Sequence, residues 1–174
     1  MSKQLEISVG IDVGKKGGVT FVSKDKKVRG YWKIPTIKDK EIDITELGEI
    51  FSRLSLNYDI GVVIIEDVHS IFGAGAKANF QFGRCLGLLE GMTIAYSLPF
   101  IKVKPKDWQK EMWEGVSLIK KPGTKKTDTK ATSLVAAQRL FPGDKFLPTE
   151  RSKVPHDGIV DGLLMAEYGR RKYL

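Results

Sequence analysis

The sequence holds few of the residues that build zinc sites and disulfides. Its 174 residues include one cysteine, Cys85, and two histidines, His69 and His156. A lone cysteine cannot form an internal disulfide, which fits a reducing compartment, and the histidines and cysteine show no zinc-site spacing. The sequence also has neither a Walker phosphate loop nor a strand, Gly-x-Gly-x-x-Gly and helix unit. It is therefore not equipped for zinc chemistry or for the common modes of nucleotide binding.

Long apolar segments are missing as well. The first eight residues lack the apolar core of a signal peptide. The most apolar helical stretch, residues 85–98, contains Glu90 and is too short to span a bilayer. With 41% hydrophobic and 29% charged residues, and no repeats, a chain of this length suits one domain with a core. We therefore expect residues 1–174 to form a single domain in the cytoplasm, away from membranes.

The charge is positive and unevenly distributed. The formal net charge is +8, and nine lysines lie between Lys102 and Lys130, against four acidic residues in the same span. Trp108 and Trp113 are interleaved with these lysines. Clustered lysines with aromatic residues are typical of nucleic-acid-binding surfaces, although a solvated loop would have the same composition. The composition favours a polyanionic partner and leaves the solvated loop open.

Hydrophobic spacing predicts an α/β chain. Three strands that follow one another should form an antiparallel meander, and the continuous apolar run at 60–65 is typical of a strand covered on both faces. We expect a mixed sheet with helices on both faces. The expected strands cover residues 8–13, 19–23, 28–34, 60–65 and 99–104.

Helices are expected between and after these strands. Thr45 should cap a helix with an apolar face of Leu47, Ile50, Phe51 and Leu54. A long helix should span 77–97, and Pro105 should open a short helix. Thr127 or Asp128 should cap a helix that buries Leu134, Val135 and Leu140, and a last helix should begin near Pro155. Residues 114–126 are predicted to be a flexible loop.

Four acidic residues stand at the ends of these elements. Asp12 lies near the end of the first strand, where a carboxylate is costly to bury unless it is paired or binds a metal; an aspartate that caps the turn is the alternative. Glu66 ends the buried strand. Asp157 and Asp161 lie one turn apart on one face of the last helix, where a cation between them would relieve their repulsion. Carboxylates of this kind suit Mg²⁺ and phosphodiester hydrolysis.

Four segments, in this order, resemble the RuvC family of Holliday-junction resolvases. They are GIDVG at 10–14, IIEDV at 64–68, FGRCLGLLEGM at 82–92 with LPFIKVKP after it, and HDGIVDGLLMAEYG at 156–169. Together they span nearly the whole chain. The resemblance implies an RNase H-like, or retroviral-integrase-like, fold with a five-stranded mixed sheet, in a bacteriophage-type branch. It also implies an endodeoxyribonuclease that resolves four-way and other branched DNA junctions by paired nicks.

The resemblance also implies the site. Asp12, Glu66 and Asp161 match the family's metal-binding acids, and Asp157 is the fourth acid, with His156 as an alternative beside it. Two Mg²⁺ ions per site are implied, for which Mn²⁺ can substitute, with no small-molecule cofactor. A homodimer is implied, and the glycine stripe on the long helix (Gly83, Gly87, Gly91) fits either that interface or packing within the chain. The expected DNA-binding residues are Lys110, Lys130, Lys15, Lys16, Arg84, Lys125 and Lys126.

Other functions compete with this one. GIDVGKKGG also resembles the phosphate loop of actin-like and sugar-kinase-like proteins, but those need a second phosphate loop and a second lobe. A module that binds branched DNA without cutting it is a further alternative, as is an RNase H-like nuclease that acts on RNA–DNA hybrids or flaps. His69 stands where the family often has an aromatic residue, and a solvent-facing loop histidine is the simpler interpretation.

Overall fold

A five-stranded mixed sheet forms the centre of the molecule. The computed structural model describes residues 4–68, 73 and 75–174. The strand order is β3-β2-β1-β6-β7; β1, β2 and β3 pair antiparallel, and β6 and β7 run parallel to β1. The predicted mixed sheet is confirmed. Its strands are β1 (Leu5–Asp12), β2 (Gly18–Ser23), β3 (Val28–Lys33), β6 (Tyr58–Glu66) and β7 (Phe100–Val103).

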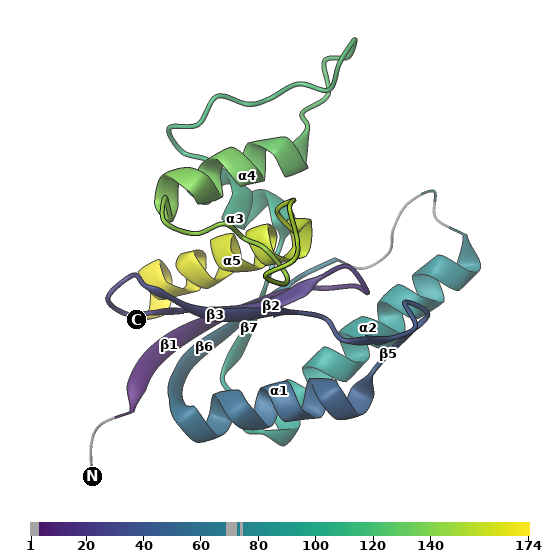
Figure 1. Ribbon diagram of the computed structural model, residues 1–174, viewed down its shortest axis with the longest axis vertical. Coiled ribbons are helices and arrows are strands. Elements are labelled where there is room, and N and C mark those ends of the chain that lie inside the picture. The colour runs from purple at the N-terminus through teal and green to yellow at the C-terminus, as the bar shows by residue number, and fades with distance from the viewer. Residues whose placement is uncertain (1–3, 69–72, 74) are drawn as a thin grey trace.

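Helices cover both faces of the sheet, as Figure 1 shows. On one face lie α1 (Ile44–Asn57) and α2 (Ala76–Ala95). On the other lies α5 (Asp157–Tyr173), with α3 (Pro105–Met112) and α4 (Thr129–Leu140) packed against it. In the part of the chain that the structure describes, no helix has the length and apolar character needed to cross a membrane.

Alternate residues of each central strand point to opposite faces. Ile7, Val9 and Ile11 are buried on the α1 and α2 side, together with the predicted apolar face of α1. Ser8 and Gly10 point to the other side, where Gly10 meets α5. The two cores therefore share the same strands and differ in which residues they take from them.

The structure corrects two details of the helices. Asp43, not Thr45, caps α1, because its Oδ1 accepts a hydrogen bond from the Glu46 backbone nitrogen at 3.0 Å. Val135 on α4 is 40% exposed, whereas Thr132 and Ser133 are buried. Small side chains on this face let α4 pack closely, so burial there does not follow hydrophobicity. Of the two residues predicted to cap α4, Thr127 and Asp128, the cap is Asp128.

Two connecting segments are more ordered than the sequence predicts. Residues 114–126 are not simply a flexible loop, because Lys120 and Thr127 form an antiparallel bridge and Lys121 and Lys126 share a backbone hydrogen bond. We call residues 120–127 the lysine hairpin; Figure 1 shows this segment extending beyond α4. A second small hairpin, β4 (Thr36–Ile37) with β5 (Glu41–Ile42), was not expected.

The glycine stripe of α2 has no close packing partner in the part of the chain that the structure describes. Side-chain carbons placed at Gly83, Gly87 and Gly91 would meet none of the described residues within 4 Å. The interpretation of close intramolecular packing is therefore wrong for these residues. By contrast, glycines do set the distance between α5 and the sheet. A Cβ on Gly10 would overlap the backbone at Gly162, and one on Gly158 would overlap the backbone at Lys16 and Gly17.

Candidate metal and nucleic-acid site

Strand alternation places two of the predicted acids on the α5 face of the sheet. Asp12 is the last residue of β1 and Glu66 is the last residue of β6. These strands are parallel neighbours, and Ile11 pairs with Ile65 in the register. Since both isoleucines belong to the core on the opposite face, the next residue of each strand faces α5. Two carboxylates thus end adjacent strands on the same face.

The N-terminal turns of α5 supply the other two acids. Asp157 is the first residue of the helix, and Asp161 follows one turn later. The close approach at Gly158 presses this end of α5 against the segment that follows Asp12. A helix that begins with bulkier residues could not come so near the ends of β1 and β6.

The acids lie close enough together to shift one another's pKa values. Burial raises the pKa of Asp12 well above its usual value, and the neighbouring Asp161 and Glu66 carboxylates add to the effect. Burial likewise raises the pKa of Asp161 to about 7, with Glu66 and Asp157 contributing. Burial also raises the pKa of Glu66. A group of acids that resists ionisation in this way is stabilised by a cation.

Lys130 of α4 supplies one cationic group. Its Nζ donates a hydrogen bond to Asp157 Oδ2 at 2.5 Å. The same ammonium lowers the pKa of both Asp12 and Asp161, partly opposing the repulsion among the acids. Because Lys130 and Asp157 side chains are 68% and 54% exposed, this pair contributes little to stability, and a competing cation can displace it.

The donor set fits a divalent metal ion, although the side chains are not yet gathered around one. Among the described residues, the buried Asp161 Oδ1 has no hydrogen-bond partner, and carboxylate oxygens are the ligands that Mg²⁺ and Mn²⁺ take. Among the described residues no three acidic, histidine or cysteine side chains already form a metal-holding group. Two of the acids are engaged elsewhere, Asp157 by Lys130 and Glu66 by Trp108.

A cavity of about 1030 Å³ opens beside the acids. Asp12, Asp157 and Asp161 line it on one side, while Gln81 and Phe82 of α2 contribute to another. Four lysines also line it: Lys15, Lys16, Lys77 and Lys130. A polyanion that enters this cavity would meet ammonium groups together with the acids.

His156 caps the start of α5 and lines the same cavity. Its buried Nδ1 has no hydrogen-bond partner within residues 4–68, 73 and 75–174. Burial lowers the pKa of this histidine, and Lys33 adds to the effect. Both His156 and Asp157 therefore lie at the site, and the alternatives for the fourth ligand both stay open.

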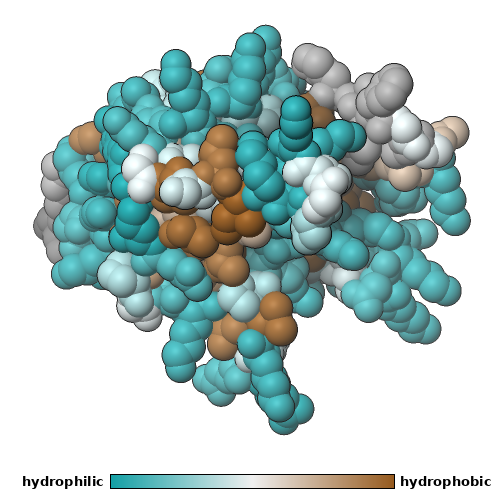
Figure 2. All heavy atoms as spheres, turned by 90° about the horizontal axis from the view of Figure 1, so that it is seen from above, coloured by the Kyte–Doolittle hydropathy of each residue, from teal (hydrophilic) through white to brown (hydrophobic). Residues whose placement is uncertain are grey.

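Only part of the predicted basic set lines this cavity. Lys15, Lys16 and Lys130 do, whereas Lys110 is exposed on α3, and Lys125 and Lys126 are exposed on the lysine hairpin. Arg84 lies 3.9 Å from Glu41 in an ion pair. Figure 2 views the molecule from the side of α4 and shows a largely hydrophilic surface with small apolar groups. His69 lies outside the described residues.

Sequence reasoning missed three residues at or behind the site. Lys77, near the start of α2, lines the cavity, and Trp108 and Ser133 contact the acids from within the core. Trp108 was noted as part of the basic stretch, but its contact with Glu66 depends on how α3 packs. No sequence signal marks Ser133.

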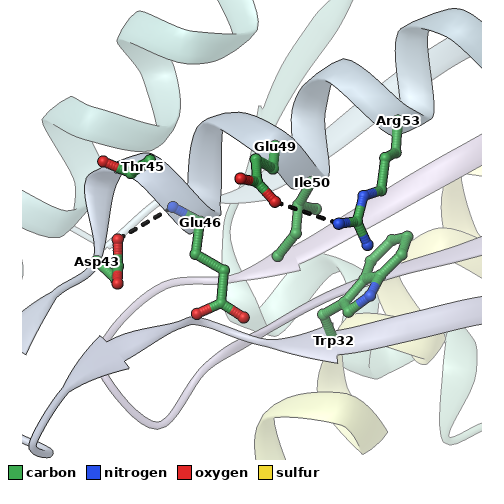
Figure 3. Close-up of a pocket in the computed structure, with 7 residues that line it drawn as sticks. All are labelled: Trp32, Asp43, Thr45, Glu46, Glu49, Ile50 and Arg53. Atoms are coloured by element: carbon green, nitrogen blue, oxygen red, sulfur yellow. Dashed lines mark hydrogen bonds and ion pairs between the residues drawn. The ribbon is translucent and has the colours of Figure 1, made fainter.

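A second cavity, of about 290 Å³, lies on the α1 side (Figure 3). Trp32 forms one side of it, and the acidic residues of the first turns of α1 point toward it. Arg53 pairs at 3.2 Å with Glu49, one turn before it on α1, and both residues line this cavity. None of the predicted site residues lines it.

Comparison with solved structures identifies the fold. RuvC of Thermus thermophilus in complex with a Holliday junction substrate superposes with a TM-score of 0.57 at 15% identity, covering 92% of this chain and 90% of that one. A second Thermus thermophilus RuvC structure gives 0.57 at 14%, covering 95% of each chain. The yeast mitochondrial Holliday junction resolvase Ydc2 gives 0.57 at 16%, covering 97% of this chain and 78% of that one. No protein-family model and no curated protein matches the sequence.

These comparisons confirm the RuvC-like, RNase H-like fold. The likeness extends along almost the whole chain, and the five-stranded mixed sheet agrees with it. At identities of 14–16% the likeness defines the fold; what the chain does has to be argued from its own residues.

Proposed function

We propose that this protein is a metal-dependent endodeoxyribonuclease that resolves Holliday junctions and other branched DNA. Residues 1–174 would act as one nuclease domain of a bacteriophage-type branch, in the cytoplasm. The observation that carries the proposal is the convergence of acids from β1, β6 and α5 beside a cavity lined by lysines. The resemblance of the fold to two junction resolvases supports it.

Asp12, Glu66, Asp157 and Asp161 would hold the metal, with His156 as an alternative to Asp157. Two Mg²⁺ ions, or Mn²⁺ in their place, would activate the attacking water and stabilise the leaving oxygen. The raised pKa of Asp12 and of Asp161 supports this assignment, since the acids gain most from a cation when they are buried together.

The lysines of the cavity would bind and orient the DNA backbone. Lys15 and Lys16 lie three and four residues after Asp12, and Lys77 of α2 also lines the cavity. If Asp157 turns to a metal, the Lys130 ammonium is released and becomes available to a phosphate group. Lys110, Arg84, Lys125 and Lys126 would contact DNA farther from the cut, where phosphate contacts position the duplex without reading its sequence.

A homodimer would place two such sites on opposite strands of a two-fold-symmetric junction. The exposed face of α2 supports this arrangement. It carries Gly83, Gly87 and Gly91, with Phe80 68% exposed and Ile94 64% exposed near its ends. Light scattering after size-exclusion chromatography should give twice the mass of one chain for the wild type. Replacing Gly87 by Glu should reduce the measured mass to that of one chain.

Cleavage of a labelled four-way junction tests the proposal. Linear duplex, RNA–DNA hybrid and flap substrates serve as controls, each with Mg²⁺ or with chelator, using wild type and Asp12→Asn. Paired symmetric nicks in the junction, lost with chelator and in the variant while binding persists, would support a resolvase. Binding without cutting would favour a non-catalytic module. Preferred cutting of hybrids or flaps would favour the other RNase H-like nucleases.

A further inference from the structure

Trp108 contacts one of the acids from inside the core. Its side chain is fully buried, and its Nε1 donates a hydrogen bond to Glu66 Oε1 at 3.2 Å. That bond lowers the pKa of Glu66 against the effect of burial, so it favours the ionised carboxylate. Trp108 does not line the cavity beside the acids, and it therefore cannot contact a substrate there.

Ser133 lies beside a second acid. It is 1% exposed, and it is close enough to Asp161 for its hydroxyl to lower the pKa of that carboxyl. Trp113 Nε1 in turn donates to Ser133 Oγ at 3.3 Å. Because the serine oxygen accepts from the indole, the hydroxyl proton is left to donate to another acceptor.

The two tryptophans connect these contacts. The rings of Trp108 and Trp113 meet edge to face, with their centroids 6.4 Å apart and an interplanar angle of 80°. Trp108 donates to Glu66 directly, and Trp113 donates to Ser133, which lies beside Asp161. This buried layer thus lies behind two acids that come from different elements, β6 and α5.

We infer that Trp108 and Ser133 are positioning residues that fix the orientation of the Glu66 and Asp161 carboxylates for the metal. The inference rests on the proposed function, since it assumes that these acids are metal ligands. A donor behind a ligand selects which carboxylate oxygen faces the ion, and losing such an outer partner typically weakens metal affinity 10- to 100-fold. An ordinary core tryptophan could pack equally well with its N–H satisfied by a backbone carbonyl.

The first test measures Mn²⁺ binding to the DNA-free protein by electron paramagnetic resonance, which counts the free ion. Trp108→Phe keeps an aromatic ring and removes the donor. We expect the dissociation constant for Mn²⁺ to rise about tenfold, with the affinity for junction DNA in chelator unchanged. Trp32→Phe is the matched control, because Trp32 lies on the α1 side of the sheet (Figure 3), and it should leave Mn²⁺ binding unchanged.

A double-mutant cycle separates positioning from folding. If Trp108 acts through Glu66, Trp108→Phe should have no further effect on Mn²⁺ affinity in a Glu66→Gln background. If the two losses multiply instead, Trp108 acts on the fold as a whole and the inference fails. Thermal melts of each variant establish that it is folded.

Ser133→Ala gives a second, smaller perturbation in case the tryptophan variant does not fold. Ser8→Ala is its control, since Ser8 is also fully buried but its Oγ has no hydrogen-bond partner in the described part of the chain. Weaker Mn²⁺ binding in Ser133→Ala and unchanged binding in Ser8→Ala would support the inference. Equal behaviour of the two serine variants would overturn it for Ser133.

The same titrations distinguish an error in the proposed metal site from an error in the positioning role of Trp108. If Glu66→Gln leaves Mn²⁺ binding unchanged, the proposed metal site is wrong and the function falls with it. If Glu66→Gln weakens binding and Trp108→Phe does not, the metal site stands and the positioning role is wrong.

Discussion

The two faces of the central sheet are built from the same strands but have different roles. One forms an apolar core, and the other carries the acids. On the α1 and α2 side, β1 contributes Ile7, Val9 and Ile11, all at most 1% exposed. On the α5 side the same strand contributes Ser8, Gly10 and Asp12. The apolar face gains stability from burial, whereas the other face holds a charged residue near a helix that approaches at glycine contacts. Consecutive residues of β1 point to opposite faces, so a shift of one residue in the register would exchange the core residues for the site residues.

The two faces also differ in what burial costs. On the α1 and α2 side most buried side chains are apolar, and the buried Thr93 hydroxyl donates to the Leu89 carbonyl at 2.7 Å, so burial there is favourable. On the α5 side, the buried atoms that lack a hydrogen-bond partner among the described residues include Ser8 Oγ and Asp161 Oδ1, and the acids there repel one another. Unsatisfied buried groups of this kind are a feature of sites that await a ligand.

The largest difference between the faces should appear in activity. Asp12→Asn should reduce junction cleavage at least about 100-fold, because it removes a proposed metal ligand rather than an outer partner, and it should raise the melting temperature of the metal-free protein by removing a repelled charge. On the opposite face, Ile11→Val should cost about 1 kcal/mol of stability and leave the cleavage rate of the folded protein unchanged. Cleavage assays and thermal melts of both variants check this.

Glycine substitutions should give the next largest difference between the two faces of the sheet. Gly158→Ala would overlap the backbone of Lys16 and Gly17, so α5 must shift, at a cost of about 1–3 kcal/mol. Gly87→Ala on α2 meets open space and should stabilise the monomer by up to about 1 kcal/mol. Urea denaturation measures both. Equal effects of the two alanines would contradict the close packing of α5.

The pH dependence of stability should also come from the α5 side. Asp161 has its pKa raised from 3.8 to about 7, so between these values the folded chain holds a proton that the unfolded chain has released. Stability of the metal-free protein should therefore fall as pH rises through this window, by on the order of 4 kcal/mol. Thermal melts from pH 4 to 8 test this. The slope should shrink in Asp161→Asn, and a slope of the opposite sign would contradict the assignment.

The smallest effect concerns the lysines. Lys130→Met should weaken junction binding roughly three- to tenfold and reduce the salt dependence of the binding constant by about one unit of slope. Lys110→Met, on an exposed residue outside the cavity, should change binding less. Binding titrations in chelator at several salt concentrations measure both. A larger loss for Lys110 would place the main DNA contacts away from the cavity.

Local sequence determined most of the fold. The alternation in β1, the apolar run of β6 and the 3.6-residue spacing of α1 are patterns that any chain would express through burial, and the predicted strands and helices follow them closely. The short hairpin of β4 and β5 was not predicted, because two-residue strands are too short to show an alternating pattern. Val135 was misplaced because hydrophobicity alone does not reveal that the facing helix needs small side chains.

The sequence by itself also determined which acids are available, since Asp12 and Glu66 end strands and Asp157 and Asp161 begin a helix. Only the tertiary structure decided which partners they have. Lys130 pairs with Asp157 across 27 residues, and Trp108 reaches Glu66 across 42. Contacts of that range depend on how α3 and α4 pack against α5, and packing is a property of shape in three dimensions that no local pattern records.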